Sequence, residues 1–303
     1  MTELVTAAPA TRAAHDKSAA LRAIGVAQIL LGLLLCAVVF GIAAATEVQQ
    51  KMAGAPAFTF AGNLVLYSAL ALYFFAAGSG ALRRRRWARP VTLAVSGVWL
   101  ALGAVITALA LAIVPRYVSN FRDAALAIGT LALLHIVIPS IFIALYRNPA
   151  MRETLEAHDP VSRWTDRVPV PVLALSLLMG FSAVSLLTGA SYAVIPLFGT
   201  TLSGAPAAVV SIALAGLLGW VAFQLYRLRR SAWWTVLLLQ LAAIGGGAAT
   251  FLRAGPEGVF RSPLLWMIAL AAWGGFFLFL MYARRYFSAP SPRTRAEDLR
   301  VAA

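Results

Sequence analysis

Long uninterrupted apolar segments dominate the pattern of hydrophobic and polar positions along this chain. No Asp, Glu, Lys or Arg occurs in residues 23–46, 52–82, 90–115, 124–146, 168–226, 231–252 and 262–283. A membrane-spanning helix needs roughly 20 apolar residues, so each of the shorter segments can form one helix. The longest, 168–226, is interrupted by the polar turn FGTTLSGAP and can form two.

These segments predict eight membrane-spanning helices. The helices are expected near residues 24–45, 61–82, 91–114, 124–146, 170–194, 207–226, 232–252 and 263–286. Runs such as LVLYSALALYFFAAG are apolar on every face, whereas a membrane β-strand would alternate polar and apolar positions over about 10 residues. A helix satisfies its own backbone hydrogen bonds in lipid. The expected fold is therefore an all-α polytopic integral membrane protein.

Composition agrees with this class. Hydrophobic residues make up 61% of the chain and charged residues 12%, against about 25% charged residues in an ordinary soluble domain. The first apolar run is longer than the core of about 7–15 residues in a cleaved signal peptide, so it is expected to remain as a span. Cys36 is the only cysteine, which excludes an internal disulfide.

The basic residues are distributed unequally between the two sides of the predicted membrane. Both termini and the loops after the second, fourth and sixth helices share one side, which carries 20 of the 25 Lys and Arg residues. The other side carries Lys51, Arg116, Arg122, Arg253 and Arg261. Because Lys- and Arg-rich loops stay cytoplasmic, both termini are predicted to be cytoplasmic. The arginine- and alanine-rich composition indicates a GC-rich bacterial genome, so the expected location is the cell (inner) membrane. The basic side of the protein should attract the anionic lipids of that membrane, which are an expected partner.

Five arginines are concentrated in residues 83–89, within the sequence ALRRRRWARPV. The main interpretation is a topology anchor, with the neighbouring tryptophan in the interfacial aromatic belt. The alternative is a specific site for an anionic lipid or phosphate. Nucleic-acid binding is not expected, because the cluster is too short to form a basic face for a duplex. The candidate anchor residues are Arg83, Arg84, Arg85, Arg86, Trp87, Arg229 and Arg230.

A weak internal repeat divides the chain into two halves. The sequence ALRRRRWARPVTL resembles RLRRSAWWTVLLL, placing Trp87 on Trp233 at an offset of 146. Each half holds an even number of helices, which predicts a parallel 4+4 repeat about the membrane normal. The expected parts are a cytoplasmic tail (1–20), a first half (21–146), a linker (147–169), a second half (170–287) and a second tail (288–303).

The linker is the longest polar connection. Asn148-Pro149 and Asp159-Pro160 each predict an N-cap followed by proline, giving short helices at 149–157 and 160–166. Its carboxylates are Glu153, Glu156, Asp159 and Asp166. Arg163 and Asp166 can pair at their spacing of three, and Trp164 is expected at the membrane interface. The segment is either a solvated linker or a docking or regulatory surface.

His135 is the one ionisable side chain deep within a predicted span. It lies four residues before Pro139, and the proline removes the hydrogen bond to the carbonyl of residue 135 and is expected to kink the helix. A histidine in lipid is costly, so it should face the bundle and have a partner. Gln28 is the first candidate partner. Gly245–Gly247 and Gly274–Gly275 are expected to mark close helix packing, with a hinge as the alternative.

No enzyme motif is present. The chain lacks GxxxxGK[ST], HExxH, GxSxG and paired Cys or Cys/His metal spacings, so no catalytic, metal or cofactor site is predicted. Two functions remain open. The first is a non-enzymatic membrane component with an assembly, lipid-interacting or sensor-coupling role, in which a protein partner or a homo-oligomer is an open question. The second is a transporter of a small uncharged or apolar solute.

Reporter fusions test the predicted topology. Fusions after residues 88, 158 and 303 should report a cytoplasmic location, and a fusion after residue 118 should report the opposite side. An external signal at residue 303 would contradict the even number of spans.

Overall fold

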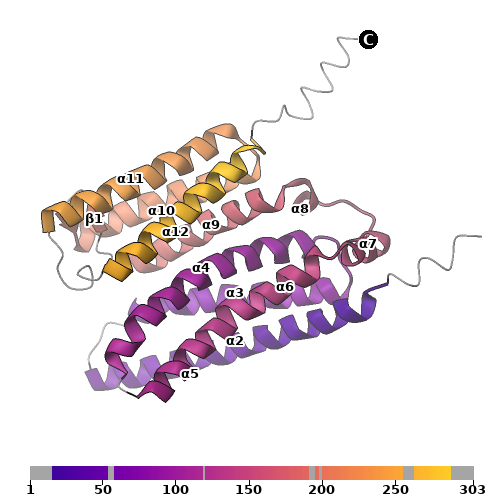
Figure 1. The fold of residues 1–303 in the computed structure, drawn as a ribbon, viewed down its shortest axis with the longest axis horizontal. Coiled ribbons are helices and arrows are strands. Elements are labelled where there is room, and N and C mark those ends of the chain that lie inside the picture. Colours follow the sequence, from indigo (N-terminus) through magenta and orange to yellow (C-terminus); the bar gives the residue numbers. More distant parts are fainter. Residues whose placement is uncertain are drawn as a thin grey trace, which may run out of the picture.

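Helices account for nearly all of the chain that the computed structural model describes, namely residues 16–53, 58–118, 120–190, 195–197, 200–254 and 263–287. The helices are α2 (Ser18–Ala53), α3 (Phe58–Leu82), α4 (Ala88–Tyr117), α5 (Phe121–Ala132), α6 (Ile138–Arg147), α7 (Pro149–His158), α8 (Trp164–Arg167), α9 (Val170–Gly189), α10 (Gly204–Tyr226), α11 (Arg230–Ala254) and α12 (Pro263–Arg284). A π-helical segment, η1 (Leu133–Val137), joins α5 to α6. Figure 1 shows α2–α6 and α9–α12 as two groups of helices.

Within the described residues, seven helical segments are long and apolar enough to cross a membrane. They are Ser18–Gly41, Ala88–Pro115, Phe121–Arg147, Val170–Gly189, Gly204–Tyr226, Arg230–Ala249 and Pro263–Arg284. A further apolar segment, Tyr67–Leu82, is shorter and belongs to α3, which runs for 25 residues. The chain is therefore a helical, multi-span membrane protein.

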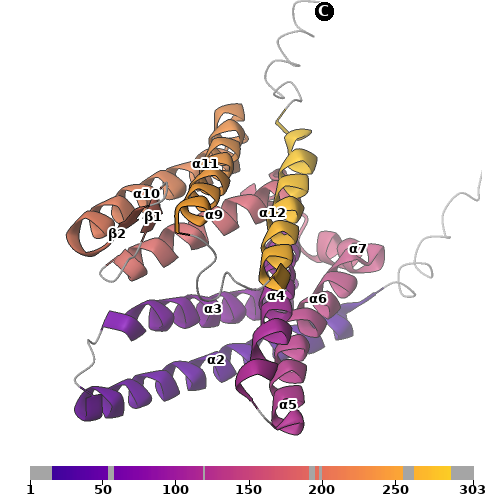
Figure 2. The ribbon, with the colours of Figure 1, turned by 60° about the vertical axis from the view of Figure 1, so that its left-hand side comes forward.

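A short β-hairpin separates α9 from α10 and was not predicted. Strands β1 (Ile195–Leu197) and β2 (Thr200–Leu202) pair antiparallel, as Figure 2 shows beside α10. The helix predicted at 170–194 is shorter in the structure, where α9 ends at Gly189 with Ala190 as its C-cap; residues 191–194 lie outside the described residues. Pro196 has no N–H and cannot continue a helix, and the β-branched threonines of β2 favour a strand.

Helix α4 lies between the two groups of helices and contributes to both apolar cores. Ala94 is fully buried in a core formed mainly by α9–α12, with Val91 and Val98 packed against it. Leu93 and Trp99, also on α4, pack against a second core formed by α2, α3, α6 and α7. The two halves are consequently joined through opposite faces of one helix.

Glycines allow the closest contacts within the first half. A Cβ atom on Gly78 would lie 2.7 Å from the carbonyl oxygen of Gly25, and one on Gly25 would lie 2.8 Å from the carbonyl oxygen of Gly78. The predicted packing role is wrong for Gly245, Gly247, Gly274 and Gly275, which are exposed and where a Cβ would meet nothing within 4 Å among the described residues. Gly246 is buried, and its packing role stays a prediction. The sequence pattern of glycines did not distinguish packed from open positions.

The loops that follow α3 and α10 share one backbone geometry. Arg84 and Leu228 both have positive φ angles, of 52° and 57°. The Arg85 N–H donates to the Gly80 carbonyl (2.8 Å) and the Arg84 N–H to the Ala81 carbonyl (3.0 Å). The same two bonds recur from Arg229 to Gln224 (3.0 Å) and from Leu228 to Leu225 (2.8 Å), an offset of 144. Each loop is a Schellman motif, which ends a helix by satisfying its last carbonyl groups.

The sequence predicts a kink at Pro139, and the structure has the π-helical turn η1 directly before this proline. The N–H of Ile138 donates to the carbonyl of Leu133, five residues earlier. Pro139 follows immediately and has no N–H for the carbonyl of His135. That carbonyl lies against α4, where a Cβ on Gly103 would collide with it. Only a glycine fits at this position of α4.

Substitution of Gly78 by Ala should weaken the packing of α2 on α3. The new methyl group would meet the backbone of Gly25 as well as the side chain of Ile29, and the backbone cannot move aside as a side chain can. The overpacking cost is about 1–3 kcal/mol. Thermal unfolding in detergent should show a lower midpoint for Gly78→Ala. Gly247→Ala is the matched control and should not lower it, so equal midpoints for the two variants would contradict the close contact.

Candidate functional site at the arginine-rich loop

The Schellman motif after α3 presents the arginine-rich loop, defined as residues 83–87, to the linker between the halves. The linker helix α7 begins at Asn148, whose side chain accepts a hydrogen bond from Ala150 N at 3.0 Å, which confirms this predicted N-cap. Met151 and Leu155 of α7 are buried in the same core as Leu21 and Tyr146. Helix α7 is thus packed on the first half by an apolar face, and its polar face lies against the arginine-rich loop.

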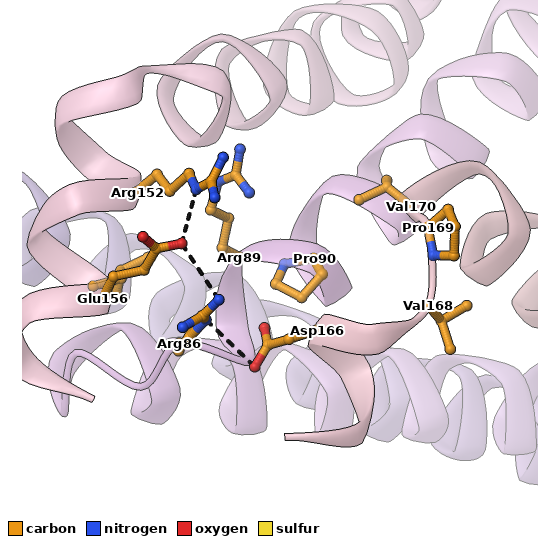
Figure 3. Close-up of a pocket in the computed structure, with 10 residues that line it drawn as sticks. Arg86, Arg89, Pro90, Arg152, Glu156, Asp166, Val168, Pro169 and Val170 are labelled. Carbon is orange, nitrogen blue, oxygen red and sulfur yellow. Dashed lines mark hydrogen bonds and ion pairs between the residues drawn. The ribbon is translucent and has the colours of Figure 1, made fainter. Parts of the chain in front are cut away.

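Arg86 is the centre of the contact between loop and linker. Its guanidinium group lies 3.4 Å from Glu156 of α7 and 3.6 Å from Asp166 of α8, and Figure 3 shows it between these two carboxylates. Its backbone N–H donates to Asp159 Oδ2 at 3.3 Å. One residue of the loop therefore contacts α7, α8 and the turn between them.

Asp159 and Asp166 are deeply buried carboxylates. Their side chains are only 6% and 7% exposed. Asp159 also lies 3.9 Å from the guanidinium groups of Arg85 and Arg163. Burying an unpaired carboxylate is costly, and removing one partner of a buried ion pair leaves that cost uncompensated. The arginines are therefore needed for the linker to hold this conformation.

Glu156 is more exposed and is paired within its own helix. Arg152 Nε donates to Glu156 Oε1 at 2.8 Å. This hydrogen bond is the largest cause of a lowered pKa of Glu156, and the charges of Arg152, Arg86 and Arg89 act in the same direction. The carboxylate is thus ionised at neutral pH and available to Arg86.

The predicted docking residues of the linker take different roles. Arg163 pairs with Asp166 through its backbone, because Arg163 N donates to Asp166 Oδ2 at 2.9 Å. The guanidinium group of Arg163 is directed to Asp159 instead. Trp164 stacks edge-on against Tyr226 at the end of α10, with ring centroids 5.3 Å apart. Helix α8 therefore contacts the second half as well as the arginine-rich loop.

The predicted helix at 160–166 is wrong. Helix α8 begins at Trp164, with Arg163 as its N-cap residue. Asp159 terminates α7 as its C-cap, and its carboxylate accepts from Arg86 rather than capping a following helix. The Asp159-Pro160 pair suggested a local N-cap, but the Asp159 carboxylate is engaged by Arg86, which is distant in the sequence.

The remaining anchor candidates lie around the same loop and its counterpart. Arg83 is exposed, and Arg84 occupies the position with positive φ. Trp87 packs on α3, since a Cβ on Gly80 would lie 2.9 Å from its ring. Arg229 and Arg230 are exposed after α10, and no ion pair to either occurs among the described residues. The anchor interpretation of these residues remains a prediction.

The structure does not bring His135 and Gln28 together as hydrogen-bond partners. His135 Nδ1 lies 3.1 Å from the Leu131 carbonyl of its own helix, and its Cβ would be 2.5 Å from a Cβ on Gly103. Gln28 is fully buried and donates to Thr92 Oγ1 at 3.5 Å, while its Oε1 has no partner among the described residues. These are two separate polar positions in the first half.

Sequence reasoning missed the roles of Arg89 and Arg152. Arg89 Nε donates to the carbonyl of Tyr146 at 3.0 Å and so ties α4 to α6. For Arg152 the sequence held one local signal, its spacing of four from Glu156 on a short helix, which allows the two side chains to pair. The described residues contain no group of His, Cys, Asp or Glu that could hold a metal ion.

No protein-family model, curated protein or solved structure matches the chain. The chemistry of the site is therefore defined by its own geometry and charge. It is a set of ion pairs, built on the buried carboxylates of Asp159 and Asp166, that fixes the linker. Helices α7 and α8 bridge the two halves.

Replacing Arg86 by Gln should release the linker. The change leaves Asp159 and Asp166 buried with fewer positive partners, which should cost roughly 2–3 kcal/mol. Limited proteolysis should then cut residues 148–168 faster than in the wild type. Arg83→Gln removes an exposed charge from the same loop and is the matched control. Equal cleavage of the two variants would contradict the role assigned to Arg86.

Acidification should weaken the contact through Glu156. Its pKa lies below the ordinary value of 4.5 in the folded protein, so its contribution is present above that pH and lost as pH falls through the folded pKa. Hydrogen exchange of α7 should accelerate below about pH 4.5, and Glu156→Gln should accelerate it already at neutral pH. An identical pH profile for wild type and Glu156→Gln would exclude this contribution.

Proposed function

We propose that the chain crosses the membrane eight times, in two four-helix halves related as a parallel repeat. The 25-residue apolar helix α3 supplies the eighth span. The Schellman motifs after α3 and α10 support this proposal, because the same backbone turn recurs at an offset of 144. The α2–α3 and α9–α10 pairs, which open the two halves, are also the most extensively packed pairs of helices.

The proposed orientation places the arginine-rich loop, the linker and both termini on the cytoplasmic side of the cell (inner) membrane. This orientation rests on the unequal distribution of Lys and Arg between the loops. In Figure 1, α7 and α8 lie at the same end of the helices, between the two groups. The linker is then a cytoplasmic bridge over the junction of the halves.

The proposed function is that of a non-enzymatic membrane component with a fixed cytoplasmic surface. The observation that carries it is the pairing of Arg86 with Glu156 and Asp166, together with the burial of Asp159. Three of the four linker carboxylates, Glu156, Asp159 and Asp166, are paired with arginines, which suits a structural surface better than a pair of reacting acids. Such a surface can dock a protein partner or couple a signal between the halves.

A transporter of a small uncharged solute is the second candidate, and the π-helical turn η1 favours it. π-helical turns occur frequently at functional sites, and this one lies in a span beside Gly103 of α4. The buried Gln28 Oε1 and Thr107 Oγ1 atoms have no partner within the described chain. These features provide polar groups inside the first half that a solute could use.

Flux through reconstituted liposomes separates the two functions. A membrane component should leave the permeability to glycerol and urea equal to that of empty liposomes, as measured by stopped-flow light scattering. Flux above that background that falls in His135→Gln would contradict the proposal and favour the transporter. The variant should be checked for an unchanged unfolding midpoint.

A further inference from the structure

A cavity of about 250 Å³ lies where the arginine-rich loop, α7 and the start of α9 meet. Its volume is several times the share of about 30 Å³ that one water molecule occupies in the liquid. Figure 3 shows the charged side chains of Arg86, Arg89, Arg152 and Glu156 on one side of it and the apolar residues Pro169 and Val170 on the other. The cavity therefore has the size and the two-sided lining of a ligand site.

The charges around the cavity do not cancel. Three arginines, Arg86, Arg89 and Arg152, line it together with two carboxylates, Glu156 and Asp166. Glu156 is shared by Arg86 and Arg152, and Asp166 lies beside Arg86. One positive charge is left without a carboxylate, and Arg89 is the arginine that forms no ion pair among the described residues.

Arg89 is held in place with its anion-binding groups unused. Its Nε is engaged by the Tyr146 carbonyl, which fixes the guanidinium plane and leaves its terminal NH₂ groups without a described partner. Figure 3 shows these groups beside the guanidinium group of Arg152. Two neighbouring guanidinium groups repel each other unless an anion lies between them, and the planar donor arrangement of arginine matches phosphate oxygens.

The start of α9 adds to the positive potential. Pro169 and Val170 line the cavity, and the 20-residue helix α9 begins there without a side-chain cap from the described residues. The N-terminus of a helix carries a partial positive charge that favours anions. The N-terminus of α9 and the arginines therefore both make the electrostatic potential in the cavity more positive.

We propose that this cavity binds a phosphate group through Arg89 and Arg152. The group can come from the headgroup of an anionic phospholipid or from soluble phosphate, and the recognition chemistry is the same. The site's two binding residues are not among the anchor residues Arg83–Arg86 expected from the sequence, although Arg86 also lines the cavity. The proposal stands whether the protein is a membrane component or a transporter.

Binding to the purified full-length protein tests the site. Native mass spectrometry in detergent would compare retention of phosphatidylglycerol with that of phosphatidylcholine, and calorimetry would measure binding of inorganic phosphate. Arg152→Gln is the principal variant, because this side chain is 58% exposed and its loss should leave the fold intact. Arg147→Gln, an exposed arginine outside the cavity lining, is the matched control.

We expect Arg152→Gln to weaken binding about tenfold, as for the loss of one charged hydrogen bond, and Arg147→Gln to leave it unchanged. Glu156→Gln should strengthen binding, because it removes a negative charge from the lining while keeping an acceptor for Arg152. Glu156→Gln is thus expected to strengthen phosphate binding while it weakens the contact of the linker with Arg86. The opposite signs distinguish the phosphate site from the linker contact.

The competition arm identifies the source of the phosphate group. Retention of phosphatidylglycerol that inorganic phosphate does not displace supports a lipid ligand, and binding of inorganic phosphate alone supports a soluble one. Competition between the two supports a shared site. Failure of the wild type to bind either, or equal binding by Arg152→Gln and Arg147→Gln, would overturn the proposal.

Discussion

The contact between Arg86 and the linker carboxylates is the interaction on which the arrangement of the linker against the helices depends. Asp159 and Asp166 are almost completely buried, and a buried carboxylate is tolerated only with a positive partner or a hydrogen bond. The linker can therefore fold against the bundle only where the arginine-rich loop meets it. Because α8 also contacts Tyr226 through Trp164, the same constraint links the first half to the second.

Helix α4 provides the second link between the halves, within the apolar part of the bundle. Its two faces belong to different cores, and its first turn carries Arg89 next to the cavity. The arginine-rich loop leads directly into this helix. A change in the linker contact is thus positioned to act on the helix that both halves share, which is a suitable arrangement for coupling them.

The spans were predictable because lipid imposes a simple rule, that about 20 apolar residues form a helix. Asn148 was predictable for a similar reason, since an N-cap depends on neighbouring residues only. The role of Asp159 was not, because its partner Arg86 is 73 residues away. The sequence matched Trp87 with Trp233 at an offset of 146, whereas the two turns of like geometry lie 144 residues apart. A tryptophan is conspicuous in a sequence, but a positive φ at Arg84 and Leu228 is not. The close contact of Gly25 with Gly78 likewise depends on how α2 and α3 cross.

A double-mutant cycle between Arg86 and Asp166 tests the central claim most directly. The unfolding free energies of Arg86→Gln, Asp166→Asn and the double variant would be measured in detergent against the wild type. A direct ion pair predicts that the double variant loses less stability than the two single variants together, by about 1 kcal/mol or more. Additive losses would show that Arg86 and Asp166 act independently and would contradict a linker held by this contact.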